Sequence, residues 1–130
     1  TRYESSAASD VYKRQVLPHL KGKLDGTAIR VPTPNVSLVD FKFNTKKNIS
    51  IESLNNKFQE YANNSLKNIL GVDRDPKVSS DYNHDSRSSI LDLSETTTVS
   101  DNFGRILTWY DNEWGFSNRM LETTAQVCNL

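Results

Sequence analysis

Strand-like and helix-like stretches alternate unevenly along this 130-residue chain, and no other feature constrains its fold as strongly. Residues 27–31, 36–43 and 105–110 place β-branched or aromatic side chains at alternate positions, which is typical of strands. Only a few segments, unequally spaced, have the apolar period of a helix. This pattern predicts an α+β fold in which helices cover the sheet mainly on one face, rather than a doubly wound sheet.

The best-marked helix is predicted at residues 51–63. Ser50 can cap its first amides, and Ile49 and Leu54 have the spacing of a hydrophobic staple. An apolar stripe follows one face of this helix and is formed by Leu54, Phe58, Tyr61 and Ala62. The other face is expected to be solvated, and it carries Asn55, Asn56, Gln59 and Asn63.

The other helical segments are shorter or lie near the ends of the sequence. Residues 16–20 have the character of a frayed helix end, which Gly22 can terminate in the left-handed conformation. A short helix is predicted at residues 65–70. The last helix is predicted from about Ser117, and we expect Cys128 on its apolar face to be a small core side chain.

The charge balance and the apolar content exclude several classes of partner. The chain has 16 Lys and Arg against 16 Asp and Glu, so no basic surface for nucleic acid or anionic lipid is expected. No apolar stretch is long enough to span a membrane or to form the core of a signal peptide. The one cysteine allows no intrachain disulfide, and a cytoplasmic location is expected.

Residues 1–15 differ in character from the rest of the chain. They are rich in Ser, Ala and charge and show neither a helical nor a strand period, which predicts a disordered arm. Residues 10–15 also match one translated reading frame of a widely used transposase sequencing adapter. We therefore expect the arm to be non-native, with an ordinary flexible terminus as the alternative, and the natural reading frame to start near Val16.

No complete catalytic or metal-binding set of residues is visible in the sequence. Cys128 lies two residues from the C-terminus, and His19 and His84 have no nucleophile beside them and no partners at zinc-ligand spacing. Glycine loops of the GxGxxG and GxxxxGK types are also missing. We therefore expect no catalytic residue and no metal ligand on this chain.

Two segments carry polar side chains in unusual places. Arg30 interrupts an apolar, β-branched segment, so its guanidinium must reach solvent, bind an anion such as phosphate, or pair with Asp40 or Asp92. Asn112 lies in a polar turn between a predicted strand and a predicted helix, where rigid flanking elements often fix a binding site. Its amide could bind an amide-bearing ligand, or it could cap the helix through an Asx turn.

Three longer motifs make the chain similar to one enzyme family. In order along the chain they are IRVPTPNVS at 29–37, VSSDYNHDSRSS at 78–89 and WYDNEWGFSNRMLETT at 109–124. The motifs and their order resemble the C-terminal catalytic domain of glyceraldehyde-3-phosphate dehydrogenase. The resemblance covers about residues 16–124, and it implies a mixed, mostly antiparallel sheet.

The resemblance implies a phosphorylating aldehyde dehydrogenase of glycolysis and gluconeogenesis. Enzymes of this family oxidise glyceraldehyde 3-phosphate with NAD and inorganic phosphate through a cysteine thioester, and they form homotetramers. Arg30 matches the family arginine that contacts the substrate phosphate and inorganic phosphate. Asn112 matches the asparagine that holds the nicotinamide carboxamide of NAD.

The sequence also departs from the family pattern. Phe116 stands where family members often have Tyr, and residues 92–101 differ from the usual DAGAGIALND. The NAD-binding domain, the nucleophilic cysteine of the SCTTN segment and the catalytic histidine would all lie upstream of Val16 and are absent here. We therefore interpret residues 16–130 as a fragment of the catalytic domain that is inactive alone.

Two alternative functions stay open on the sequence. Phe116 and Met120 also fit the related erythrose-4-phosphate dehydrogenases, whereas Tyr110 and Ser117 fit the glycolytic enzymes at least as well. The other alternative is a non-catalytic interface or anion-binding module that uses Arg30 without chemistry. The adapter-like segment argues against such a module, because an evolved module would have its own start.

Overall fold

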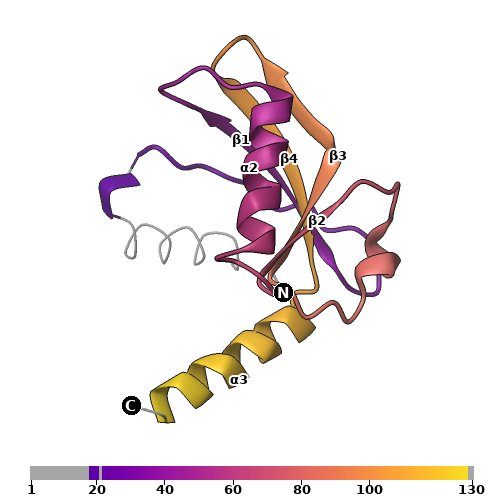
Figure 1. Cartoon of the computed structure of the whole chain (residues 1–130). Helices are drawn as coiled ribbons and strands as arrows, with labels where there is room; N and C mark the ends of the chain where they lie inside the picture. The colour runs from indigo at the N-terminus through magenta and orange to yellow at the C-terminus, as the bar shows by residue number, and fades with distance from the viewer. Residues whose placement is uncertain (1–17, 21, 129–130) are drawn as a thin grey trace. The chain divides into compact units, whose positions relative to one another are not determined.

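The computed structural model describes residues 18–20 and 22–128 (Figure 1). These residues belong to two units, Thr1–Pro32 and Thr33–Leu130. The predicted arm at residues 1–15 lies outside the described residues.

In the first unit, the short 3₁₀ helix η1 (Pro18–Leu20) is followed by an extended segment. Gly22 has a φ of 76°, the left-handed conformation expected of a residue that ends a helical turn. Residues 24–31 form no strand, so the strand predicted at residues 27–31 is wrong. Ile29 and Val31 are exposed there, and β-branched residues favour a strand only where a sheet surface receives them.

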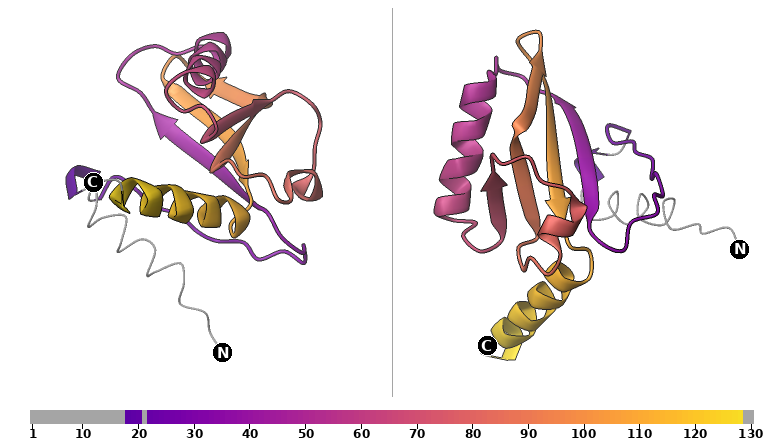
Figure 2. Two further views of the ribbon diagram at one scale, coloured as in Figure 1. Left: turned by 60° about the horizontal axis from the view of Figure 1, so that its bottom comes forward. Right: turned by 90° about the vertical axis from the view of Figure 1, so that its right-hand side faces the viewer.

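The second unit is built on a four-stranded sheet with the order β1-β4-β3-β2 (Figure 1). The strands β1 (Ser37–Asn44) and β3 (Ser89–Val99) run antiparallel to β4 (Phe103–Tyr110), whereas β2 (Leu70–Asp73) is parallel to β3. The α-helix α2 (Ile51–Asn63) packs on β2 and β3 (Figure 2). The predicted α+β fold with a mixed, mostly antiparallel sheet is confirmed.

Alternate strand residues build two separate cores, one on each face of the sheet. Ile90 pairs with Trp109 and the neighbouring Leu91 pairs with Thr108, so the two pairs point to opposite faces. The core on the α2 face contains Leu91, Leu93 and Ile106, with Phe43, Phe58 and Val72 against them. The core on the other face contains Val36, Tyr82 and Ile90, with Trp109 against them.

This second core fixes two loops beside the end of β4. It includes Val36, which directly precedes β1, and Tyr82, which ends the 3₁₀ helix η2 (Ser79–Tyr82). The rings of Tyr82 and Trp109 stack with their centroids 5.6 Å apart. Burial, with a smaller contribution from nearby carboxylates, raises the pKa of the Tyr82 phenol to about 12, so the ring stays neutral in its core.

The helix α2 begins and ends at the predicted residues. The Ser50 hydroxyl accepts a hydrogen bond from the Ser53 amide at 3.1 Å, and the Ser53 hydroxyl accepts one from the Ser50 amide at 2.9 Å. Each serine therefore satisfies an amide that the helix geometry leaves without a partner. The predicted cap at Ser50 is confirmed.

The expectation that Asn55 is solvated is wrong, and an irregularity in β3 explains why. Asp92 pairs with Leu107 and Thr97 pairs with Arg105, so five steps along β3 match two steps along β4. Within this bulge the Leu93 carbonyl accepts a hydrogen bond from Asn55 Nδ2 at 3.0 Å. Because a buried carbonyl needs a donor, the bulge brings a polar side chain of α2 into the interface, and Asn55 is buried.

Two other helix predictions also need correction. Residues 64–69 form hydrogen-bonded turns instead of the helix predicted at 65–70, because Leu70 and the next residues pair with β3 as β2. The final helix α3 (Trp114–Cys128) begins three residues before the predicted Ser117. Cys128 is exposed, like the rest of the last turn of α3, and is not the core side chain that we expected.

Candidate functional site

The turn between β4 and α3 contains a buried carboxylate and an exposed amide side by side. Asp111 is 1% exposed, whereas the next residue, Asn112, is exposed to solvent. An ionised carboxylate is costly to bury unless hydrogen bonds replace its water. The contacts of Asp111 therefore define the geometry of this turn.

One oxygen of Asp111 caps the helix α3. Oδ1 accepts hydrogen bonds from the Glu113 amide at 3.0 Å and from the Trp114 amide at 2.8 Å. The Asp111 backbone carbonyl accepts from the Gly115 amide at 3.1 Å. Asp111 thus occupies the N-cap position, where a carboxylate satisfies free amides and also favours the positive end of the helix dipole.

The other oxygen of Asp111 holds two loops. Oδ2 accepts from the Asn35 side-chain amide and from the His84 backbone amide, both at 2.9 Å. Asn35 donates its second amide hydrogen to Asn83 Oδ1 at 3.0 Å. The loop before β1, the loop after η2 and the start of α3 therefore meet at one carboxylate.

The pKa of Asp111 shows how strongly these contacts favour the ionised form. Burial by itself would raise this pKa, but the hydrogen bonds from Trp114, His84, Glu113 and Asn35 lower it from 3.8 to about 2. The carboxylate is therefore ionised at neutral pH, although its side chain is buried.

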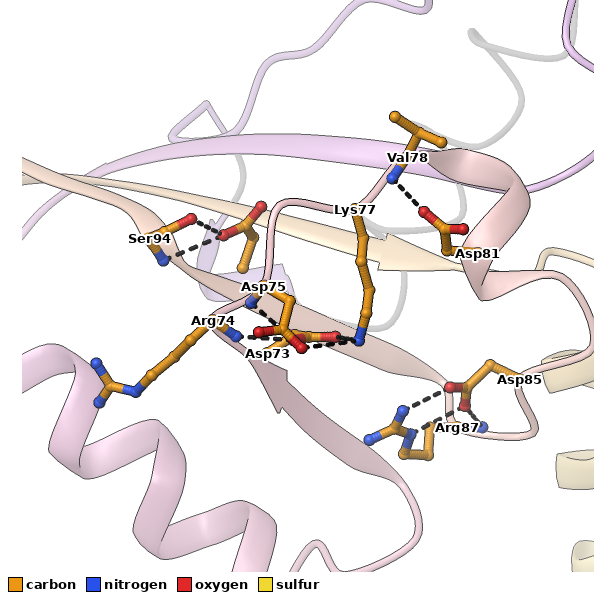
Figure 3. A network of polar contacts seen from close by, with 10 residues as sticks. Asp73, Arg74, Asp75, Lys77, Val78, Asp81, Asp85, Arg87 and Ser94 are labelled. Atoms are coloured by element: carbon orange, nitrogen blue, oxygen red, sulfur yellow. Dashed lines mark hydrogen bonds and ion pairs between the residues drawn. The ribbon is translucent and has the colours of Figure 1, made fainter.

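An ion pair lies in the loop that follows His84. Figure 3 shows the guanidinium of Arg87 against the carboxylate of Asp85. The distance from Nε to Oδ1 is 2.9 Å and that from Nη2 to Oδ2 is 2.5 Å. The hydrogen bond with Arg87 lowers the pKa of Asp85. A Cβ atom on Gly115 would lie 3.0 Å from the Arg87 carbonyl, so this loop packs closely on the first turn of α3.

Asn112 is presented to solvent by this framework. Its side-chain amide makes no hydrogen bond within the described part of the chain. The alternative in which Asn112 itself caps the helix is wrong, because Asp111 occupies that position. The amide keeps one acceptor and two donors for a ligand.

Arg30 lies in the first unit, on the extended segment at residues 24–31, and it is exposed. The two carboxylates considered as its ion-pair partners have contacts of their own. Asp40 pairs with Lys42 and Arg105, and Asp92 accepts from the amide and the hydroxyl of Ser94. The two predicted binding residues thus belong to different units, Arg30 to the first and Asn112 to the second.

Among residues 18–20 and 22–128, no group of three or more His, Cys, Asp or Glu side chains is arranged to hold a metal ion. None of the helices described is both long enough and apolar enough to cross a membrane.

Asp111 is the important residue of this site that sequence reasoning missed. The available signal was the aspartate directly before a polar turn and a helix, which is the residue type preferred at an N-cap. Its link to Asn35 and His84 had no local signal, because those residues are 76 and 27 positions away.

Comparisons with known proteins agree with the motif pattern. A family model described as the C-terminal domain of glyceraldehyde 3-phosphate dehydrogenase matches residues 3–112. A glyceraldehyde-3-phosphate dehydrogenase of Cereibacter sphaeroides is 49% identical over 115 residues, covering 88% of this chain and 34% of that protein. One from Xanthobacter flavus is 50% identical over the same shares. The chain therefore spans about a third of the length of these relatives.

The buried carboxylate predicts a specific pH dependence of stability. Because folding lowers the pKa of Asp111, its contribution is complete above 3.8 and is lost as the pH falls towards about 2. Over this pH range, the free energy of unfolding of the wild type should fall by about 2 kcal/mol more than that of the Asp111→Asn variant. Urea unfolding at a series of pH values measures the difference.

The exposed Asp101→Asn variant serves as the charge-matched control, and it should follow the wild-type pH profile. Parallel profiles for the wild type and Asp111→Asn would contradict the assignment of a lowered pKa to Asp111.

Proposed function

Because the chain belongs to the glyceraldehyde 3-phosphate dehydrogenase family, we propose that it forms part of the catalytic region of an NAD-dependent, phosphorylating aldehyde dehydrogenase. Its substrates are glyceraldehyde 3-phosphate and inorganic phosphate, in glycolysis and gluconeogenesis. The assembled enzyme is a cytoplasmic homotetramer. The family itself is one of oxidoreductases, and the finer assignment to substrate and cofactor rests on the two sites below.

The observation that carries the proposal is the exposed amide of Asn112 on a rigid turn. The nicotinamide ring of NAD bears a carboxamide, which offers one acceptor and two donors, the complement of the Asn112 amide. Asp111 holds the backbone of the turn from inside, so less backbone freedom is lost when a ligand binds the Asn112 amide. These residues fit the nicotinamide end of the cofactor, and NAD would supply the hydride acceptor.

Arg30 is the proposed contact for phosphate. Its guanidinium lies on an exposed segment, and a planar fork of donors suits the oxygens of a phosphate group. Both the substrate and the inorganic phosphate carry such oxygens. Arg30 thus accounts for the phosphorylated substrate class, and Asn112 accounts for the cofactor.

The chemical step also needs a thiolate nucleophile and a base, and we assign neither to this chain. Cys128 is exposed on the last turn of α3, 16 residues beyond Asn112 in sequence, and no base contacts it among the residues described. We propose that residues 16–130 alone are inactive and that the nucleophile and base belong to other parts of the enzyme.

Asn112→Asp tests the cofactor contact in a hybrid enzyme. In this hybrid, residues 16–130 replace the matching third of the Cereibacter sphaeroides protein. The substitution removes both donors and adds a charge, so we expect NAD binding to weaken by about 1–3 kcal/mol. Thermal stability should hardly change, because Asn112 caps nothing. Calorimetric titration with NAD and thermal unfolding measure the two quantities.

The matched control is Asn48→Asp, which makes the same change at an exposed loop residue, and it should leave NAD affinity unaltered. If Asn112→Asp binds NAD as tightly as this control, Asn112 does not contact the cofactor.

Arg30→Lys tests the phosphate contact in the same hybrid. The substitution replaces a bidentate fork with a point charge, so substrate binding should weaken by about 1–3 kcal/mol. The Michaelis constants for glyceraldehyde 3-phosphate and inorganic phosphate should rise accordingly. Steady-state kinetics with erythrose 4-phosphate as a second substrate shows which aldehyde the site prefers. Arg74→Lys, at an exposed arginine of the second unit, is the control. Unchanged Michaelis constants with reduced stability would make Arg30 a purely structural residue.

A further inference from the structure

Two strained residues lie next to the buried carboxylate of Asp111. Four non-glycine residues of the described chain have positive φ, and two of them, Val36 at 69° and His84 at 62°, adjoin its hydrogen bonds. His84 donates its own amide to Asp111, and Val36 directly follows the donor Asn35. A β-branched residue such as valine strongly disfavours this conformation, so the surrounding contacts must hold it in place.

The contacts that hold the two strained loops converge on one oxygen. Asn35 donates both amide hydrogens, one to Asp111 Oδ2 and one to Asn83 Oδ1. These bonds connect the loop before β1 to the loop after η2. Val36 is then buried against Tyr82 and Ile90. The core and the carboxylate together therefore impose the strained conformation.

The opposite oxygen of the same carboxylate sets the direction of α3. Oδ1 takes the amides of Glu113 and Trp114, the two residues that follow Asn112. The imidazole of His84 also lies against the Trp114 ring, with centroids 5.4 Å apart and planes at 49°. Asn112 thus lies between two hydrogen-bonded residues in the sequence, and its own side chain makes no hydrogen bond within the described part of the chain.

We propose that Asp111 is a positioning residue: its carboxylate locks the Asn35 loop, the His84 loop and the start of α3 into one arrangement, and so fixes where the Asn112 amide meets its ligand. This role rests on the proposed function only for the identity of that ligand, the nicotinamide carboxamide. Asp111 is buried and touches no ligand itself. It acts through the backbone on either side of Asn112.

Asp111→Asn removes the charge and one acceptor oxygen of this side chain without changing its shape. The substitution replaces one acceptor oxygen with an NH₂ donor, so whichever way the new amide turns, two of the four donors face another donor. Adding Asn35→Asp restores a complementary pair with the polarity reversed, and the double variant has the wild-type net charge. Asp101→Asn is the control for loss of one exposed charge.

Amide hydrogen exchange on the 130-residue chain tests whether the Asp111 carboxylate holds the Asn35 loop, the His84 loop and the start of α3 in place. In the wild type, the amides of His84, Glu113 and Trp114 should be protected relative to that of Asn112, which has no acceptor within the described residues. In Asp111→Asn, at least one amide of this set should exchange about tenfold faster, since it loses its acceptor. The proposal would be overturned if, in the wild type, the amides of His84, Glu113 and Trp114 exchanged as fast as that of Asn112. It would also be overturned if none of these three exchanged faster in Asp111→Asn.

The hybrid enzyme tests the consequence for the ligand. Asp111→Asn should raise KM for NAD about tenfold with a smaller effect on kcat, and the added Asn35→Asp should recover part of the loss. A residue that serves stability alone would lower thermal stability and leave KM for NAD at the value of the Asp101→Asn control, which would refute the positioning role.

The two readouts keep this inference distinct from the proposed function. The exchange measurement involves no NAD, so it tests the hold of Asp111 on the three segments even if Asn112→Asp leaves NAD affinity unchanged. In that case the proposed cofactor contact of Asn112 is wrong, while the structural part of the Asp111 proposal is retained. If Asp111→Asn does not fold, the wild-type exchange pattern and the double variant decide the question.

Discussion

The buried carboxylate of Asp111 is the contact on which the rest of the candidate site depends. It receives four hydrogen bonds, two on each oxygen, from segments that lie far apart in the sequence. An ionised group with four donors keeps its charge inside the protein, which is why its pKa falls to about 2 despite burial. The proposed role of Asn112 in binding depends on these bonds, because they hold the backbone on either side of its exposed amide.

The same logic explains the polar side chain inside the helix–sheet interface. The bulge of β3 leaves the Leu93 carbonyl facing α2, and the Asn55 amide donates to it. In both places a polar side chain is buried because an irregular backbone exposes groups that need partners. The sheet can then pack a core on each of its faces, while β4 ends in the turn that carries the candidate binding residue Asn112.

The sequence was sufficient for features set by local patterns and for those carried by long motifs. The cap at Ser50, the helix Ile51–Asn63 and two of the strands follow from residue types a few positions apart. The family followed from three motifs in order. Local patterns failed where a distant partner decides the outcome: residues 27–31 have no partner strand, residues 70–73 pair with β3, and the bulge buries Asn55. The hydrogen bonds of Asp111 join residues up to 76 positions apart, so the spacing of residues in the sequence could not reveal them.

The most direct test of this account is the pKa of Asp111 itself, measured by following its side-chain carboxyl carbon by NMR as the pH is lowered. A carboxylate held by four hydrogen bonds should titrate at about 2, well below the ordinary 3.8 of aspartate. A value at or above 3.8 would mean that the hydrogen bonds do not outweigh the cost of burial. The turn would then lack the fixed framework on which the presentation of Asn112 depends.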